Sequence, residues 1–224
     1  MNNYPKIKFC GLVNYEEVDF ACKKNIYWAG FIYVEGSSRF ISYKDSKDII
    51  SYFKNKIKFV GVFVNANNKS IKLGIDAGID YIQLHGEETP ERCEEIKDLY
   101  KIPIIKAIPI AEESDLKSIE SYNYICDYFL IDKKNTNKNS YNGGTGNVFD
   151  WNIINKNKKW LDKHKPWILS GGLSVHNIAE AIELTETKAV DVSSGIEYNP
   201  GSKSRELMDL FATKVNNIDY KVKG

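Results

Sequence analysis

Eight short apolar runs recur along this chain of 224 residues, and each is followed by a stretch with helical spacing. The runs are rich in β-branched and aromatic residues and lie at 7–12, 28–34, 59–64, 81–84, 104–108, 128–131, 167–169 and 189–192. Their nearly continuous apolar character is typical of strands that are buried on both faces. Apolar residues at helical spacing lie between them, as at Cys93, Ile96, Leu99 and Tyr100. Strands that alternate with helices predict parallel βαβ units.

Eight strand–helix units fit either an open doubly wound sheet or a closed barrel. The count of eight favours an α/β TIM (β/α)8 barrel, at roughly 28 residues per unit against a usual total of ~250. No linker interrupts the alternation, so we expect one domain over residues 1–224. One long connection, 133–149, follows the sixth strand, and connections of this length are often functional. Its Lys- and Asn-rich part, 133–142, is more typical of a solvated segment than of a nucleic-acid-binding patch.

Composition argues against several classes of protein. Lys and Arg number 31 against 30 Asp and Glu, and a net charge of +1 argues against a general nucleic-acid binder. No run approaches the ~18 apolar residues of a membrane helix, and the first residues lack the apolar stretch of a signal peptide. The four cysteines and three histidines are scattered, which predicts reduced thiols and no metal site. We therefore expect a cytoplasmic protein with no nucleic-acid or membrane partner.

Residues that can carry chemistry follow the predicted strands, and in a barrel such strand ends meet on one face. They are Cys10, Arg39, Gln83, His85, Lys106, Asp132 and Asp191. A thiolate at Cys10 could act as a base or nucleophile, although free cysteine is more often a small buried hydrophobe. Asp132 could be a general acid with a raised pKa or an ordinary salt-bridged carboxylate. Arg39 could hold an anion or pair with a surface acid, and His85 could orient a substrate or be structural.

Two turns rich in glycine and serine follow the last two predicted strands. They comprise Gly171, Gly172 and Leu173 after the seventh strand, and Ser193, Ser194 and Gly195 after the eighth. Glycines let the backbone approach a ligand closely, and N–H groups at a helix start favour negative charge. Phosphate sites recur at this position in barrels. The two turns together predict a phosphate-binding site.

A series of short motifs runs almost end to end through the chain. They read KFCGL at 8–12, VGVFVN at 60–65, QLHG at 83–86, GGTG at 143–146, FDW at 149–151, LSGGL at 169–173, DVSSGIE at 191–197 and PG-x-K at 200–203. In this order they resemble the motifs of the phosphoribosylanthranilate isomerase family of tryptophan biosynthesis. The resemblance implies a TIM barrel with a small-molecule substrate and no cofactor or metal, in a monomer or homodimer.

The resemblance also implies a reaction and roles for the site residues. The family converts N-(5-phosphoribosyl)anthranilate to 1-(2-carboxyphenylamino)-1-deoxyribulose 5-phosphate by an Amadori rearrangement. By this resemblance Asp132 is the general acid that protonates the furanose ring oxygen, and Cys10 is the general base that removes the C2 proton. Arg39 is expected to bind the anthranilate carboxylate, and the two late turns the phosphate. Further expected substrate contacts are Gln83, His85 and Asp191, and Gly143, Gly144, Thr145 and Gly146 match a loop over the active site.

Three residues depart from the family pattern. Ser38 stands where proline commonly precedes the arginine, Phe9 replaces an aliphatic residue, and Ser204 stands where an acid is common. None of these changes removes a proposed catalytic group.

Two other readings remain open at the level of sequence. One is a different phosphosugar barrel enzyme, either a metal-dependent ribulose-phosphate epimerase or an indole-glycerol-phosphate synthase centred on a lysine. Only His85 among the histidines lies at a strand end, and Lys106 is the strongest lysine candidate. The other is a non-enzymatic barrel that binds a phosphorylated metabolite or a protein, against which the presence of both Cys10 and Asp132 argues.

Overall fold

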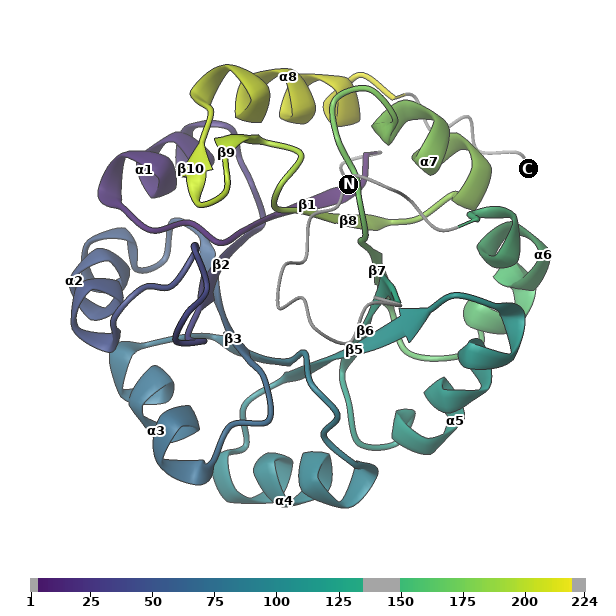
Figure 1. Ribbon diagram of the computed structural model, residues 1–224, viewed down its shortest axis with the longest axis horizontal. Helices are drawn as coiled ribbons and strands as arrows, with labels where there is room; N and C mark the ends of the chain where they lie inside the picture. The colour runs from purple at the N-terminus through teal and green to yellow at the C-terminus, as the bar shows by residue number, and fades with distance from the viewer. Residues whose placement is uncertain (1–3, 135–149, 219–224) are drawn as a thin grey trace.

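A computed structural model describes residues 4–134 and 150–218 of the chain. Eight parallel strands close into a barrel in the order of the sequence, and the helices form a ring around it (Figure 1). The strands are β1 (Lys6–Cys10), β2 (Trp28–Ile32), β3 (Lys58–Phe63), β4 (Tyr81–Leu84), β5 (Ile104–Ile110), β6 (Tyr128–Lys133), β7 (Trp167–Leu169) and β8 (Ala189–Val192). The predicted single-domain TIM barrel is therefore confirmed, with small shifts at the ends of several strands.

The helices that surround the barrel follow the strands in turn. They are α1 (Tyr15–Lys23), α2 (Tyr43–Phe53), α3 (Asn68–Ala77), α4 (Pro90–Tyr100), a short 3-10 helix η1 (Glu113–Lys117), α5 (Ser118–Tyr122), α6 (Asn152–Leu161), α7 (Ile178–Thr185) and α8 (Arg205–Asn216). A two-stranded hairpin, β9 (Glu197–Asn199) and β10 (Ser202–Lys203), is inserted between β8 and α8. In Figure 1 this hairpin lies near α1 and α8 at the rim of the barrel.

Helix caps explain where several helices begin. Asn67 accepts a hydrogen bond from the backbone N–H of Ser70, and Gly78 ends α3 in the left-handed conformation. Two other serines of a type common at helix caps, Ser114 and Ser174, cap neither η1 nor α7. Ser114 lies inside η1, which begins after Glu112. Ser174 starts a turn that precedes α7, because its N–H donates to Oδ1 of Asn177, the residue just before that helix.

Alternation along the strands divides the core into two layers. Residues such as Ile7, Phe9, Phe129 and Val190 pack in a large cluster that includes buried residues of the helices. A smaller apolar cluster comprises Trp28, Val60, Ile105, Ala107, Leu130, Ile168 and Ala189. Because successive strand residues point to opposite faces, this smaller cluster fills the interior of the barrel. It forms the apolar floor beneath the carboxyl ends of the strands.

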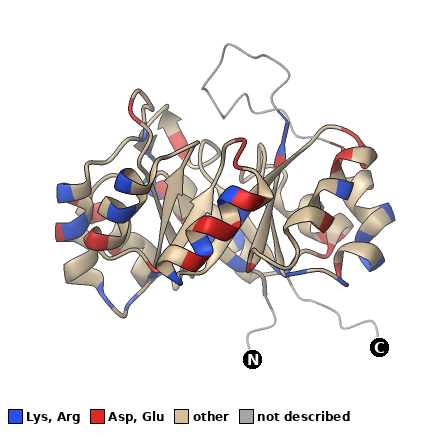
Figure 2. Ribbon diagram, turned by 90° about the horizontal axis from the view of Figure 1, so that it is seen from below, with Lys and Arg blue, Asp and Glu red and all other residues tan. Residues whose placement is uncertain are grey.

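Charged residues lie mainly on the outer helices and the loops (Figure 2). Lys and Arg alternate there with Asp and Glu, in keeping with the nearly balanced composition. Within the described residues, no helix is both long and apolar enough to span a membrane.

Candidate active site

Polar side chains occupy inward-facing positions in or just beyond the carboxyl-terminal halves of β1, β4, β6, β7 and β8. They are Lys8, Cys10, Gln83, Asp132, Ser170 and Asp191. Each alternates with outward-facing residues of the large cluster, as Cys10 does with Phe9. The strand ends therefore meet in a polar layer above the apolar floor, on the face where the sequence predicts chemistry.

Cys10 ends β1 as a free thiol that is 5% exposed. Its neighbour across the sheet is Gly30 of β2. A Cβ atom added at Gly30 would lie 3.0 Å from Sγ of Cys10 and 3.2 Å from Nζ of Lys8, so both side chains lie close to this glycine. Burial raises the pKa of the Cys10 thiol, Lys8 lowers it, and Asp191 raises it again, with a net upward shift. The ammonium groups of Lys8 and, to a smaller extent, Lys203 are thus the charges that favour the thiolate form of Cys10.

Lys8 and Asp191 form a buried ion pair directly beside Cys10. They lie opposite one another where β1 pairs with β8 and closes the barrel, and Nζ lies 2.8 Å from Oδ1. Burial lowers the pKa of Lys8, but the charges and hydrogen bonds of Asp191 and Cys10 together outweigh this effect and the pKa is raised. The other carboxylate oxygen accepts from Oγ of Ser170 at 3.2 Å. Both oxygens of Asp191 are therefore engaged by protein groups, and its predicted contact with substrate stays a prediction.

Asp132, His85 and Gln83 form a row across the barrel mouth. Nε2 of His85 lies 3.1 Å from Oδ2 of Asp132, and Nε2 of Gln83 lies 2.9 Å from Nδ1 of His85. The other oxygen of Asp132 accepts from the backbone N–H of Lys133 at 2.8 Å. With the Gln83 amide in this orientation, Nδ1 of His85 accepts, so Nε2 carries the proton that faces Asp132.

Arg39 takes part in a second ion-pair cluster, which involves the β9–β10 hairpin. Its Nε and Nη2 donate to the two carboxylate oxygens of Glu197, each at 2.7 Å. Nζ of Lys203 lies 2.6 Å from Oε1 of the same carboxylate. Sequence reasoning assigned no role to Glu197 or Lys203, although both lie in the motifs DVSSGIE and PG-x-K.

The two glycine- and serine-rich turns lie side by side, as a shared phosphate site requires. An isolated parallel bridge joins Ser174 to Gly195, and an added Cβ at Gly195 would lie 1.9 Å from the carbonyl oxygen of Leu173. Gly171 and Gly172 adopt φ values of 85° and 72°, in the left-handed region that favours glycine. The predicted active-site loop residues Gly143, Gly144, Thr145 and Gly146 lie outside the described residues.

Lys106 does not face the barrel mouth. It alternates with Ile105 and Ala107 of the apolar floor, so its side chain points outward to the helix layer. There Nζ lies 3.1 Å from Oε2 of Glu88 and donates to the carbonyl oxygen of Gly86 at 2.8 Å. This placement excludes Lys106 as the centre of a lysine-based site and removes the sequence argument for a synthase.

Each of the three departures from the family pattern has a structural partner. Ser204 caps α8 by accepting from the N–H of Leu207 at 3.1 Å. The ring of Phe9 packs edge-on against Phe211, with 6.3 Å between the ring centroids. The backbone of Ser38 packs against Gly201 of the hairpin, where an added Cβ atom would lie 2.1 Å from the carbonyl oxygen of Ser38. The loop that carries Arg39 is therefore in close contact with the backbone of the hairpin.

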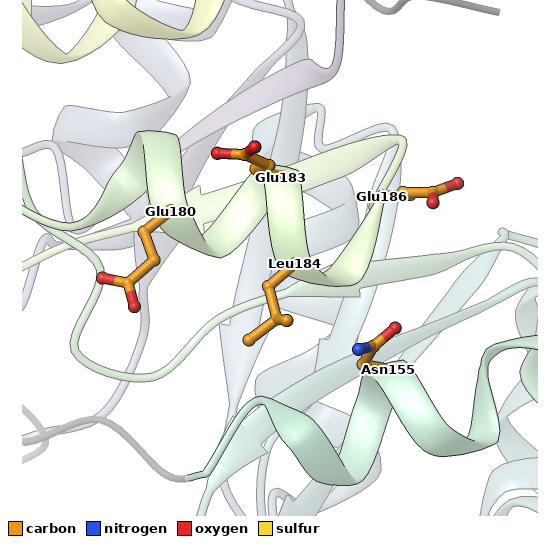
Figure 3. Close-up of a pocket in the computed structure, with 5 residues that line it drawn as sticks. All are labelled: Asn155, Glu180, Glu183, Leu184 and Glu186. Atoms are coloured by element: carbon orange, nitrogen blue, oxygen red, sulfur yellow. The ribbon is translucent and has the colours of Figure 1, made fainter. Parts of the chain in front are cut away.

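A surface cleft lies away from this site, between α6 and α7 on the outside of the barrel (Figure 3). Asn155, Glu180, Glu183, Leu184 and Glu186 line it. Its residues come from the outer helices and not from the strand ends. Within the part of the chain that the structure describes, no group of three or more His, Cys, Asp or Glu is arranged to hold a metal ion.

The fold and the polar layer define the class of protein. A closed (β/α)8 barrel that brings a cysteine, a carboxylate and paired glycine-rich turns to its carboxyl-terminal face has the architecture of a barrel enzyme. The particular family follows from comparison. The family model for N-(5'-phosphoribosyl)anthranilate (PRA) isomerase matches residues 7–214, and this chain belongs to that family.

Relatives and solved structures agree with this assignment. The chain is 37% identical over 219 residues to the N-(5'-phosphoribosyl)anthranilate isomerase of Rhizobium etli, with 97% of each chain covered. It is 38% identical to the enzyme of Rhizobium meliloti over 215 residues, which cover 96% of this chain and 98% of the other. The crystal structure of the Thermotoga maritima enzyme superposes with a TM-score of 0.85 at 31% identity, over 96% of this chain and all of that one. A crystal structure of a phosphoribosyl anthranilate isomerase in complex with reduced 1-(o-carboxyphenylamino)-1-deoxyribulose 5-phosphate has a TM-score of 0.81 at 29% identity, over 96% of this chain and all of that one.

Proposed function

We propose that this chain is an aldose–ketose isomerase that carries out the Amadori rearrangement of N-(5-phosphoribosyl)anthranilate, the third step from chorismate to tryptophan. The product is 1-(2-carboxyphenylamino)-1-deoxyribulose 5-phosphate. The observation that carries the proposal is the placement of Cys10 and Asp132 on β1 and β6, both facing inward at the same end of the barrel. Such a reaction needs one acid and one base on different sides of the sugar.

In the first step, Asp132 acts as the general acid. Its carboxyl group gives a proton to the furanose ring oxygen while the bond from that oxygen to C1 breaks. The nitrogen lone pair forms the C1–N double bond, so the ring opens to a Schiff base. His85, 3.1 Å from Oδ2, fixes the direction of the carboxyl group, and Gln83 fixes the imidazole in turn.

In the second step, Cys10 acts as the general base. The thiolate removes the proton from C2, and the electron pair of that C–H bond forms the C1–C2 double bond of an enolamine. The enolamine then tautomerises to the ketone, as C1 gains a proton and the C2 hydroxyl loses one. Lys8 supports this role because its buried ammonium group favours the thiolate that a base requires.

The substrate carries an anion at each end, and the barrel mouth offers a partner for each. The turns at 171–173 and 193–195 lie side by side and would receive the phosphate through their backbone N–H groups. Arg39 would bind the anthranilate carboxylate, for which a guanidinium offers paired donors. A substrate held in this way would have its reacting C1 and C2 atoms between Asp132 and Cys10.

We also propose a cytoplasmic, single-domain enzyme in which residues 1–224 form one unit, as a monomer or homodimer. All four cysteines are free, and unpaired buried thiols suit a reducing compartment. The described residues belong to one barrel with a continuous outer core.

The loss of phosphoribosylanthranilate fluorescence tests the proposed function. Purified protein without added metal is expected to remove the fluorescence, and Asp132→Asn and Cys10→Ser are expected to remove it far more slowly. The matched control is Glu95→Gln, which alters an exposed pair with Arg92 on the outside of the barrel. No turnover by the wild-type protein, together with retained binding of the reduced product analogue, would instead support a binding module.

A further inference from the structure

The β9–β10 hairpin has no role in the mechanism above, yet it contributes two buried charges to the barrel mouth. The Glu197 side chain is 3% exposed and the Lys203 side chain is fully buried. Both are thus removed from solvent, unlike the other ion pairs on the helices, such as the exposed pair of Lys101 and Asp98. A charge that loses its hydration is costly unless it is paired, so this cluster is more than a surface contact.

Glu197 approaches the guanidinium of Arg39 along one edge only. Its two oxygens accept hydrogen bonds from Nε and Nη2. These two nitrogens form the side edge of the planar guanidinium group. A guanidinium has five N–H donors, so the second Nη2 hydrogen and both Nη1 hydrogens remain. Among the described residues, none accepts a hydrogen bond from Nη1. The end edge of Arg39, formed by Nη1 and Nη2, is therefore left for a ligand.

Lys203 connects this cluster to the neighbouring turn and to Cys10. Its Nζ donates to the carbonyl oxygen of Ser193 at 3.0 Å and lies 3.3 Å from the hydroxyl. That hydroxyl donates to the carbonyl oxygen of Cys10 at 3.0 Å. One continuous row of contacts thus joins Arg39, through Glu197 and Lys203, to the turn proposed for phosphate and to the strand that carries the base.

We infer that Glu197 is a positioning residue that makes the site selective for a substrate with an aromatic carboxylate, by holding the end edge of Arg39 toward the barrel mouth. The inference rests on the proposed function, since it takes Arg39 as the carboxylate-binding group. With Glu197 in place the cluster of one anion and two cations keeps a net charge of +1, which suits one more carboxylate. Without it, two cations would face each other and Arg39 would lose its bidentate anchor.

Electrostatics and packing of the hairpin agree with this role. Burial would raise the pKa of Glu197, but hydrogen bonds from Arg39 and the charge of Lys203 hold it below its usual range, so the anchor stays ionised at neutral pH. Gly201 at the hairpin turn packs against the carbonyl oxygen of Ser38, the residue before Arg39. The hairpin therefore holds both the head group of Arg39 and the backbone that carries it.

The test compares two ligands that differ in the carboxylate. The first is reduced 1-(o-carboxyphenylamino)-1-deoxyribulose 5-phosphate, and the second is ribulose 5-phosphate, which keeps the sugar and phosphate but has no carboxyphenyl group. In Glu197→Gln we expect affinity for the first to fall about tenfold or more, in line with loss of a charge-assisted bond, and affinity for the second to stay within about twofold. KM is expected to rise by a larger factor than kcat falls. Glu95→Gln, which removes the carboxylate of another Arg–Glu pair, is expected to change neither affinity.

The outcomes separate this inference from a structural role and from the proposed function. Equal weakening of both ligands would show that Glu197 only maintains the hairpin, and unchanged binding of both would show that Arg39 needs no anchor. Either result overturns the inference while the wild-type enzyme remains active. A wild-type protein that neither turns over the substrate nor binds the first ligand would overturn the proposed function itself. If Glu197→Gln does not fold, Glu197→Asp keeps the charge but shortens the reach, and the same selective loss is expected.

Discussion

Nε2 of His85 lies 3.1 Å from Oδ2 of Asp132, and the two residues come from the ends of different strands, β4 and β6. The buried side chain of Gln83, which is 1% exposed, contacts the other ring nitrogen of His85 and fixes the imidazole. The side chain of Asp132 is partly exposed to solvent. The carboxyl group therefore has a fixed direction on one side and access to a ligand on the other. This combination is what a general acid at the barrel mouth requires.

Replacement of Asp132 by asparagine is expected to remove most of the turnover and little of the binding. The amide has nearly the same shape and can still accept from the N–H of Lys133, but it cannot deliver a proton to the ring oxygen. The kcat should fall by about 10²–10⁴, the usual contribution of one acid or base. Steady-state fluorescence gives kcat, and calorimetry with the reduced product analogue gives binding. A kcat equal to that of the wild type would remove Asp132 from the mechanism.

The pH dependence of kcat/KM is expected to report the ionisation of Cys10. Burial raises the pKa of the thiol, Lys8 and Lys203 lower it, and Asp191 raises it, with a net upward shift. Because the proposed reaction needs the thiolate of Cys10 together with the protonated carboxyl group of Asp132, kcat/KM should pass through a maximum and fall at both lower and higher pH. Cys10→Ser should lower kcat/KM by about 10²–10⁴ and remove the limb of the profile that the thiol causes. A Cys10→Ser profile with both limbs at the same pH values as in the wild type would contradict the assignment.

Gly195→Ala is expected to separate the two turns proposed for phosphate binding. The new Cβ would lie 1.9 Å from the carbonyl oxygen of Leu173, so the turn after β8 must move away from the turn after β7. Affinity for the reduced product analogue should fall, together with the free energy of unfolding in urea. The control is Gly36→Ala, where φ is 84° but nothing lies within 4 Å of the added Cβ. That variant should lose about 1–2 kcal/mol of stability from backbone strain and keep its affinity. Equal affinity losses in both variants would argue against a shared site at 171–173 and 193–195.

The sequence predicts the strands well because each is a short apolar run, but the same property hides which way a side chain points. In a strand buried on both faces there is no polar alternation to mark the inward residues. Lys106 therefore looks like a candidate for the barrel mouth, whereas the structure places it in the helix layer with Glu88. Asp191 and Lys8 are both interior, but their pairing depends on closure of the barrel between β1 and β8.

Some residues of the candidate site can be predicted from the sequence and others cannot. Cys10, Asp132 and the two turns are predictable because each follows a strand, and barrel topology alone brings strand ends together. The partners that orient Arg39 are not predictable in this way. Glu197 is separated from Arg39 by 158 positions, and it lies in a hairpin whose path across the barrel rim no local pattern describes. Only the motifs DVSSGIE and PG-x-K mark the segment as unusual.

The buried pair of Lys106 and Glu88 gives a last prediction, which separates a structural lysine from a catalytic one. The two side chains are 3% and 2% exposed, and Glu88 also accepts from the N–H groups of Asn65 and Gly86. Lys106→Met leaves the carboxylate buried without its cation, so the free energy of unfolding in urea should fall by about 3–5 kcal/mol.

The double variant Lys106→Met/Glu88→Gln removes both charges and should recover a large part of that loss, since the two changes act on one contact. Because Lys106 faces the helix layer, kcat per folded molecule should remain within about threefold of the wild-type value in both variants, as expected when no transition-state contact is removed. A catalytic lysine would behave differently, because the double variant would regain stability while kcat stayed lower by about 10² or more. Urea unfolding and fluorescence turnover on the same preparations therefore decide between the two roles.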